Sequence, residues 1–216
     1  MMALGRHGFS GLRALLCIGA HSDDIEIGCG GTLLRLLREF PGATVHYVVL
    51  GSDPERASET RAAAGRLLRG AAEFRIDVRD FRNGYFPWVG SRIKDYFETL
   101  KGEIRPDLIL THFRDDRHQD HRLVSDLTWS TFRDHLVLEY EIPKYDGDIG
   151  RPNLFVPLTS ADVADKLAML MECFPSQHRR SWFSEDTFLA LMRLRGIESN
   201  APEGYAEAFH CRKLVI

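Results

Sequence analysis

The sequence predicts an α/β fold in which a mostly parallel central sheet carries helices on both faces. Short apolar segments of strand length alternate with segments whose apolar residues recur at helical spacing. Strands that alternate with helices in this way form parallel βαβ units. The chain has 216 residues, 44% of them hydrophobic, which is enough for one sizeable core. We therefore expect a single domain over 1–216, with a short N-terminal arm at 1–12.

Each expected strand is a short run of apolar residues. The segment 13–21 contains a continuous apolar run over 14–20, and 43–51 is rich in β-branched residues. The segment 72–81 alternates apolar and polar residues and ends in a turn-like RNG sequence. Two further apolar segments, 106–113 and 136–142, complete the expected strands.

The expected helices follow these strands and begin at typical capping residues. Four leucines of the first helix are spaced for one apolar face, and Ser58 is a plausible N-cap for the second. Thr159 or Ser160 caps the fifth helix and Ser184 caps the sixth. The full set of expected helices is 30–40, 57–70, 91–104, 121–135, 159–174 and 184–197.

The composition excludes several classes of protein. A formal net charge of −3 lacks the basic excess of a nucleic-acid binder. No apolar run has the length of a membrane span, and residues 1–12 lack the apolar stretch of a signal peptide. The four cysteines are dispersed without a CxxC pair, which favours reduced thiols. We expect a cytoplasmic protein without a transmembrane segment, and the sequence leaves a homo-oligomer open.

The segment 20–32, AHSDDIEIGCGGT, joins the first expected strand to the next helix. The adjacent carboxylates of Asp23 and Asp24 are costly at the end of a buried strand unless a cation neutralises them. His21 adds a third metal-binding side chain at this point. The glycines that follow let the backbone pass close beneath a ligand. Because the segment does not match GxGxxG, nucleotide binding is disfavoured.

A second polar cluster, THFRDDRHQDH at 111–121, follows the end of another expected strand. The carboxyl ends of parallel strands meet at one edge of a sheet, so the two clusters should lie together. His118 and His121 are three residues apart at a helix start and therefore share one face. Catalytic zinc sites use three histidine or carboxylate ligands, and a further carboxylate can act as general base. The two clusters together predict a catalytic metal site.

Each cluster alone has a plain structural alternative. His21, Asp23 and Asp24 would also suit a strand-end turn with a capping aspartate. The HQDH sequence would suit a solvated helix N-terminus, and Cys29 is most simply a small packing residue. Solvation explains the two clusters much less well once they share one sheet edge, and this favours the metal site.

The two motifs resemble those of a known family. AHSDDIEIGCGGTL resembles the signature AHPDD-x-E-x-G-x-GG of the PIG-L/LmbE-like zinc-dependent de-N-acetylases. RHQDHRL resembles the second motif of that family, HPDH or HxDH. SETRAAAGRLL stands where the family has an arginine-led helix, and the final GYAEAFHCRKLVI resembles its closing segment. The resemblance covers roughly 13–216 and implies a Rossmann-like deacetylase domain.

The resemblance also implies a set of site residues. His21, Asp24 and His121 match the zinc ligands of the family, and Fe²⁺ or another divalent metal would suit the same ligands. Asp23 matches the general base that activates water. His118 matches the histidine that stabilises the oxyanion or protonates the leaving amine.

Three more residues are implied around this set. Asp120 would orient a histidine through a hydrogen bond, and Arg61 stands where some members place an arginine that contacts substrate. The position of a tyrosine found in some members is Asp116 here. Arg117 could replace that tyrosine electrostatically or hold Asp116 or Asp115 in a salt bridge, and a solvated ion pair is the alternative. The family prolines are replaced by serine and glutamine, which supply no ligand, so we expect the turns to survive with less stiffening.

The implied activity is hydrolysis of an N-acetyl amide on an amino sugar, such as N-acetylglucosamine, or on a glycoconjugate, which releases acetate and a free amine. A metal-dependent hydrolase of another acyl amide and a non-catalytic binding protein of the same fold are the alternatives. The Gly/Pro-rich segment 143–158 is expected to be a loop, either a substrate lid or a surface connection. The segment YFPWVG at 85–90 could form an aromatic wall for a sugar ring, with core packing as the alternative for Trp88.

Overall fold

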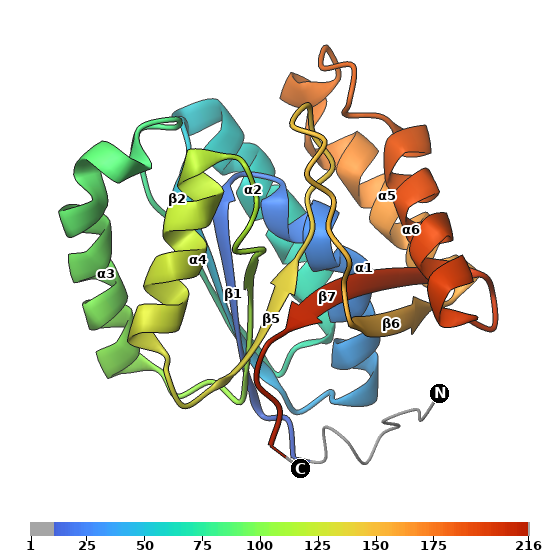
Figure 1. Cartoon of the computed structure of the whole chain (residues 1–216), viewed down its shortest axis with the longest axis horizontal. Helices are drawn as coiled ribbons and strands as arrows, with labels where there is room; N and C mark the ends of the chain where they lie inside the picture. The colour runs from blue at the N-terminus through green and yellow to red at the C-terminus, as the bar shows by residue number, and fades with distance from the viewer. Residues whose placement is uncertain (1–10, 216) are drawn as a thin grey trace.

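A computed structural model describes residues 11–215 and contains a seven-stranded sheet (Figure 1). The strands are β1 (Ala14–His21), β2 (Thr44–Gly51), β3 (Glu73–Val78), β4 (Leu108–His112), β5 (Leu136–Tyr140), β6 (Leu154–Leu158) and β7 (Tyr205–Cys211). The α-helices are α1 (Asp24–Glu39), α2 (Pro54–Leu67), α3 (Gly90–Glu103), α4 (Gln119–Thr131), α5 (Ser160–Cys173) and α6 (Glu185–Ser199). Short 3-10 helices are η1 (Leu68–Gly70), η2 (Phe86–Val89) and η3 (Pro175–Gln177).

The strand order is β3-β2-β1-β4-β5-β7-β6. The first five strands pair in parallel, whereas β7 runs antiparallel to both β5 and β6. The predicted α/β fold with a mostly parallel sheet is therefore confirmed. From β1 the chain proceeds outward through β2 and β3, and then returns to place β4 on the other side of β1. Such a reversal opens a crevice at the carboxyl ends of the two central strands, which is where ligands bind in sheets of this kind.

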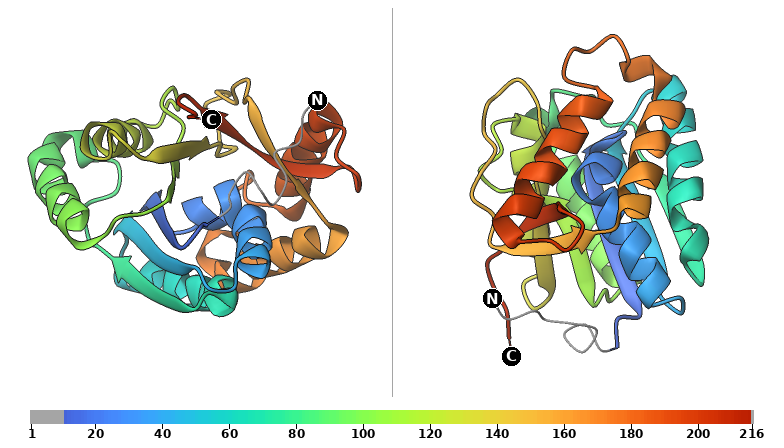
Figure 2. Two further views of the ribbon diagram at one scale, coloured as in Figure 1. Left: turned by 90° about the horizontal axis from the view of Figure 1, so that it is seen from below. Right: turned by 90° about the vertical axis from the view of Figure 1, so that its right-hand side faces the viewer.

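Helices cover both faces of the sheet (Figure 2). Successive residues of β1 face opposite sides, so Leu15 and Cys17 join one apolar cluster while Leu16 and Ile18 join the other. The first cluster packs under α1, α2, α5 and α6, and the second packs under α3 and α4. Burial on both faces explains why the central strands read as continuous apolar runs.

The predicted helices are all present, but three begin two or more residues earlier than the sequence pattern predicted. Helix α1 begins at Asp24 rather than Gly30, because the acidic turn itself is helical. Helix α2 begins at Pro54, and its N-cap is Asp53 rather than Ser58, since the Asp53 side chain accepts a 2.9 Å hydrogen bond from Arg56 N. Helix α4 begins directly after His118. Thr159 and Ser184 cap α5 and α6 as predicted.

The segment 143–158 is only partly the expected loop. Its last residues form β6, which pairs with β7 at the edge of the sheet. Pro157 within this strand and the glycines before it conceal the strand pattern, because proline is tolerated only in edge strands. The closing segment likewise forms β7.

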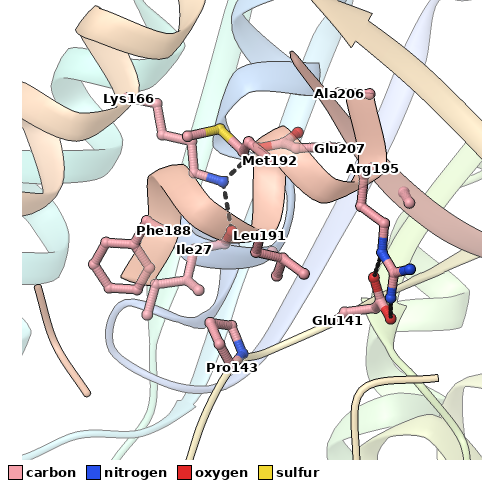
Figure 3. A pocket seen from close by; sticks show the side chains of 12 residues that line it. Ile27, Glu141, Pro143, Lys166, Phe188, Leu191, Met192, Arg195, Ala206 and Glu207 are labelled. Atoms are coloured by element: carbon pink, nitrogen blue, oxygen red, sulfur yellow. Dashed lines mark hydrogen bonds and ion pairs between the residues drawn. The ribbon is translucent and has the colours of Figure 1, made fainter. Parts of the chain in front are cut away.

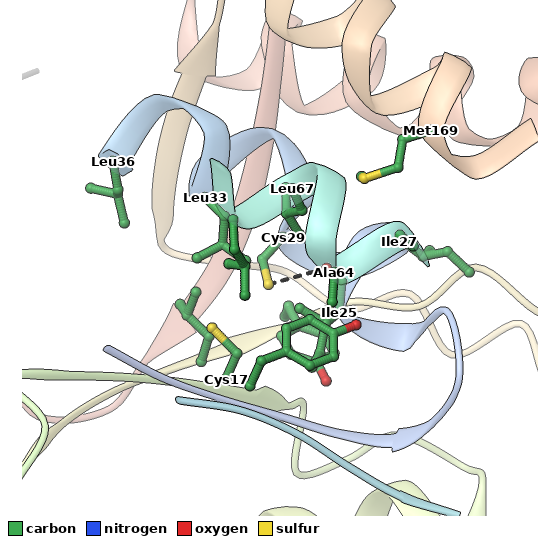
Figure 4. Close-up of a cluster of buried hydrophobic side chains, with 14 of the residues drawn as sticks. Cys17, Ile25, Ile27, Cys29, Leu33, Leu36, Ala64, Leu67 and Met169 are labelled. Carbon is green, nitrogen blue, oxygen red and sulfur yellow. Dashed lines mark hydrogen bonds between the residues drawn. The ribbon is translucent and has the colours of Figure 1, made fainter. Parts of the chain in front are cut away.

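Cys29 packs in the larger apolar cluster, and its Sγ donates to Ile25 O at 3.2 Å (Figure 4). Most of the expected N-terminal arm, residues 1–10, lies outside the described residues. Across the described part of the chain, none of the helices combines the length and apolarity that a membrane crossing would need.

Candidate metal centre

The two polar clusters meet at the carboxyl edge of the sheet, beside the reversal of strand order. β1 ends at His21 and its neighbour β4 ends at His112. Helix α1 begins at Asp24, and helix α4 carries His121 in its first turn. Parallel pairing of the two strands therefore brings together side chains that are separated by about ninety residues or more in the sequence.

The three residues expected as metal ligands present their donor atoms to one another. His121 Nε2 lies 3.2 Å from His21 Nδ1. Asp24 Oδ2 lies 3.5 Å from His21 Nδ1, and Asp24 Oδ1 lies 3.6 Å from His121 Nε2. Ligands about 2.1 Å from a tetrahedral metal ion are about 3.4 Å apart. The three separations are close to this value, with His21 facing one oxygen of the Asp24 carboxylate and His121 facing the other.

A carboxylate holds the other nitrogen of each histidine. His21 Nε2 lies 3.0 Å from Asp120 Oδ2, and His121 Nδ1 lies 2.9 Å from Asp116 Oδ2. Such hydrogen bonds fix the ring orientation and make the facing nitrogen a better ligand. Burial and the neighbouring His112 lower the pKa of His121 to about 3, which keeps this imidazole neutral, as a metal ligand must be.

Asp23 lies beside this group in an uncommon backbone conformation. Its φ of 101° is left-handed, a conformation that L-residues other than glycine seldom adopt and that costs roughly 1–3 kcal/mol. The two adjacent carboxylates face different partners, since Asp23 faces Arg56 whereas Asp24 faces histidines. Asp23 Oδ2 lies 2.8 Å from Arg56 Nη2, without the alignment of a hydrogen bond. Burial raises the pKa of Asp23 to about 8, although the Arg56 charge acts to lower it.

His118 lies at the rim, half-buried, as the N-cap of α4. Its Nδ1 accepts a 3.2 Å hydrogen bond from Asp120 N, which leaves Nε2 to carry the proton of the neutral ring. A ring nitrogen of His118 lies within 4.8 Å of nitrogens of His21 and His121. Burial and the charge of His21 lower the pKa of His118.

His112 belongs to the same cluster, although it was not predicted as a site residue. It is fully buried, and its ring stacks on His121 at 3.9 Å between centroids. His112 Nε2 accepts from Ala20 N at 2.9 Å and lies 3.2 Å from Asp24 Oδ2. Asp24, His112 and His121 thus form a second group of donors within 4.8 Å of one another. Only its position at a strand end pointed to His112, and a strand-end side chain can face either side of a sheet.

The arginine beside the site is Arg56, not Arg61. Besides facing Asp23, the Arg56 guanidinium donates to Ser22 O. Arg61 is exposed and donates at 3.4 Å to Ile76 O, in the middle of an outer strand. Because α2 begins earlier than predicted, Arg56 lies in the first turn of this helix, and its side chain reaches the site.

Arg117 forms neither of the salt bridges, to Asp116 or to Asp115, that the sequence left open. The cation beside Asp116 is Lys144, whose Nζ lies 2.9 Å from Asp116 Oδ2. Lys144 also donates to Asp148 at 2.6 Å, and Asp148 in turn accepts from Arg117 N. Among the described residues, no ion pair involves the exposed Arg117 side chain. Lys144 therefore connects the loop after β5 to Asp116, the carboxylate that hydrogen-bonds to His121.

The aromatic segment before α3 lies on the surface, and the alternative of core packing for Trp88 is wrong. Trp88 is 73% exposed and Tyr85 is 43% exposed, whereas Phe86 is buried. The rings of Tyr85 and Trp88 lie 5.7 Å apart. Phe86 N donates to Asp120 Oδ1 at 3.1 Å, so this segment is joined to the residue that holds His21.

Residues 16–132, more than half of the chain, match the sequence model of the PIG-L family, described as GlcNAc-PI de-N-acetylase. The chain belongs to the PIG-L family. The matched region contains both polar clusters, so the resemblance noted in the motifs is confirmed. Membership supports an enzyme that removes acetyl groups.

The chain is also similar to individual proteins. It is 31% identical over 143 residues to the uncharacterized deacetylase YaiS of Escherichia coli K12, covering 61% of this chain and 75% of YaiS. The conserved protein TT1542 of Thermus thermophilus has a similar structure, with a TM-score of 0.75, 24% identity and coverage of 94% and 96% of the two chains. The N,N'-diacetylchitobiose deacetylase of Pyrococcus horikoshii gives a TM-score of 0.68, with 21% identity and coverage of 94% and 85%.

The same fold also occurs in an enzyme named for a different reaction. GalB, the 4-carboxy-2-hydroxymuconate hydratase of Pseudomonas putida KT2440, gives a TM-score of 0.69 at 18% identity, with 95% and 98% coverage. The fold alone therefore does not determine the reaction, and deacetylation is supported by the family match and by the residues of the site.

Proposed function

We propose that this PIG-L protein is a zinc-dependent hydrolase that removes an N-acetyl group from an amino sugar or glycoconjugate, releasing acetate and a free amine. The observation that carries the proposal is the triangle of donors from His21, Asp24 and His121, with the Asp23 carboxylate beside it. A protein that needed only its shape would have no use for a buried carboxylate in a strained turn next to three metal-type donors.

His21 Nδ1, His121 Nε2 and an Asp24 oxygen would hold the ion, with Asp120 and Asp116 orienting the two rings. Two imidazoles and one carboxylate would suit zinc and also Fe²⁺. When bound, the metal supplies a Lewis acid that polarises the acetyl carbonyl and lowers the pKa of water at the site.

Asp23 is the proposed general base. Its carboxylate takes one proton from water as the oxygen of that water bonds to the carbonyl carbon, and its conjugate acid returns the proton to the amide nitrogen. Cleavage of the C–N bond then yields acetate and the amine. Arg56, 2.8 Å from Asp23 Oδ2, holds the carboxylate in place and favours its ionised form against burial.

His118 is the proposed donor to the oxyanion. Its neutral ring directs Nδ1 to the Asp120 backbone and leaves the Nε2 proton free to face negative charge on the former carbonyl oxygen. The same residue is the alternative proton donor to the leaving amine.

The sugar part of the substrate is inferred from the family and from the surface near the site. The family description names a GlcNAc conjugate, and the Pyrococcus horikoshii enzyme named above is a deacetylase of a GlcNAc disaccharide. In this chain Tyr85 and Trp88 expose aromatic rings from a segment fastened to Asp120, and aromatic faces stack well on sugar rings. The loop after β5, which Lys144 fastens beside His121, is the proposed substrate-side loop.

The test is acetate release from a panel of N-acetylated sugars, nucleotide sugars and glycosides, using protein of known metal content. We expect release that stops when the metal is chelated and returns when Zn²⁺ is added. Binding of about one metal equivalent without acetate from any compound would favour another acyl amide, which the same panel in N-formyl and N-propionyl form would reveal. Failure to bind metal would contradict the proposal and favour a binding protein.

A further inference from the structure

Helix α1, which begins with Asp24, is broken one turn after its start. Cys29 has φ −148° and ψ 18°, which are not helical, so the chain of hydrogen bonds along α1 is interrupted there. The break separates a short first turn, which presents Asp23 and Asp24 to the site, from the longer helix that follows. A helix end buried in this way needs partners for the backbone groups that it releases.

Two charged side chains from distant elements supply these partners. Glu207 of β7 accepts hydrogen bonds from Gly31 N at 2.9 Å and from Thr32 N at 2.6 Å, so it caps the second part of α1. Lys166 of α5 donates to Ile27 O at 2.6 Å and so caps the end of the first turn. Anions at a helix N-terminus and cations at a helix C-terminus are the favourable arrangement for the helix dipole.

The two side chains also pair with each other, with Lys166 Nζ 2.6 Å from Glu207 Oε1 (Figure 3). Both are almost completely buried, at 2% and 4% exposure. They line a small cavity that a second buried ion pair, Glu141 with Arg195, also lines. A buried ion pair stabilises a fold less than apolar packing would, so stability alone does not explain why these two charges are buried here. Their hydrogen bonds to the broken helix suggest a different role.

Packing restricts the same turn. A Cβ atom on Gly28 would lie 2.2 Å from Tyr140, and one on Gly31 would lie 2.6 Å from Leu158. The backbone on both sides of Cys29 therefore packs closely against side chains of the sheet, and at Gly31 these include Glu207 itself, whose Oε1 would lie 3.2 Å from an added Cβ.

We propose that Lys166 and Glu207 are positioning residues that hold the first turn of α1, and thereby set the placement of Asp23 and Asp24 for metal binding and water activation. The inference rests on the proposed function, because it assigns these two residues to the metal site described above. Neither residue touches the site itself, and both act through the backbone of Ile27, Gly31 and Thr32.

The experiment compares Lys166→Met with the double variant Lys166→Met/Glu207→Gln, which removes both charges and so leaves no unpaired buried carboxylate. Arg195→Met is the matched control. It leaves the Glu141 carboxylate, which lines the same cavity, without its ion-pair partner, and Arg195 makes no hydrogen bond to α1 among the described residues. Zn²⁺ affinity is measured by competition with a chelator, amide exchange at Gly31 and Thr32 is measured by NMR, and the free energy of unfolding is measured with urea.

Both Lys166 variants should bind Zn²⁺ about tenfold or more weakly. In the double variant the amide protection of Gly31 and Thr32 should also fall, because a neutral amide replaces the carboxylate that accepts from both. Arg195→Met should be destabilised like Lys166→Met but keep wild-type Zn²⁺ affinity. Unchanged affinity in a folded double variant would overturn the inference, as would an equal loss of affinity in Arg195→Met. Failure of the proposed function is distinguishable, because the wild-type protein would then bind no Zn²⁺ at all.

Discussion

His21 and Asp120 are joined by a 3.0 Å contact between Nε2 and Oδ2, although 99 residues separate them in the sequence. The same carboxylate accepts from Gly84 N at 2.6 Å and from Phe86 N at 3.1 Å. Asp120 therefore connects three segments at the sheet edge: the end of β1, the start of α4 and the aromatic segment before α3. Because Asp120 binds Nε2 of His21, the other ring nitrogen, Nδ1, faces Asp24 and His121.

Asp120→Asn should weaken Zn²⁺ binding about 10- to 100-fold, because an amide cannot hold the imidazole as a carboxylate does. Chelator competition measures the affinity. Asp126→Asn, an exposed position on the same helix, is the control and should leave affinity unchanged. Wild-type affinity in Asp120→Asn would show that the hydrogen bond does not tune the ligand.

Arg56→Met and Arg61→Met separate the arginine that the structure places at the site from the one that the motif suggested. Loss of a charge-assisted contact of about 1.5–3 kcal/mol should lower kcat/KM about 10- to 100-fold for Arg56→Met. Arg61→Met should stay within about twofold of wild type, since among the described residues its guanidinium hydrogen-bonds only to Ile76 O. Steady-state kinetics measure kcat/KM for both variants. A larger loss in Arg61→Met than in Arg56→Met would contradict the prediction and favour Arg61 as the arginine that contacts substrate.

Gly28→Ala and Gly65→Ala should change stability in opposite directions. A Cβ at Gly28 would meet Tyr140 at 2.2 Å, and such overpacking costs about 1–3 kcal/mol. A Cβ at Gly65, within α2, meets nothing within 4 Å, so alanine should stabilise the protein by about 0.5–1 kcal/mol. Urea unfolding measures both values, and a neutral Gly28→Ala would mean that the turn packs less tightly than described.

His210 should make stability depend on pH. Burial, with the charge of Arg195, lowers its pKa to about 4, and the ring stacks on Phe113 at 3.7 Å. Because the folded-state pKa lies below the unfolded value of about 6.5, the contribution is complete above pH 6.5 and is lost as the pH falls toward 4. His210→Phe keeps the ring but cannot be protonated. Its free energy of unfolding should therefore fall less than that of wild type between pH 7 and pH 4.5, and equal falls would contradict the assignment.

The fold could be predicted because the central strands are buried on both faces. Their unbroken apolar runs, followed by capped helices, identify parallel βαβ units without any knowledge of pairing. The two C-terminal strands could not be recognised in this way. Pro157 interrupts the pattern of β6, and antiparallel addition of β7 beside β5 is a pairing between distant segments that local sequence does not encode.

The neighbours of the site were harder to predict than its centre. His21, Asp24 and His121 stand in short motifs at strand and helix ends, so topology alone brings them together. Arg56 and Lys144 lie outside both motifs and reach the site through the start of α2 and the path of a loop. His112 lies within the second polar cluster, but whether its side chain reaches the site depends on which face of the sheet it takes at the strand end. These are tertiary details, and the sequence carries no signal for them beyond residue type.

The most direct measurement determines Zn²⁺ content and acetate release together in wild-type protein and in Asp23→Asn, with a substrate identified from the N-acetylated panel. General bases contribute about 10²- to 10⁴-fold, so Asp23→Asn should retain about one equivalent of Zn²⁺ while acetate release falls by about that factor. Acetate release at the wild-type rate by Asp23→Asn, or by wild-type protein stripped of metal, would contradict the proposed metal-dependent deacetylation.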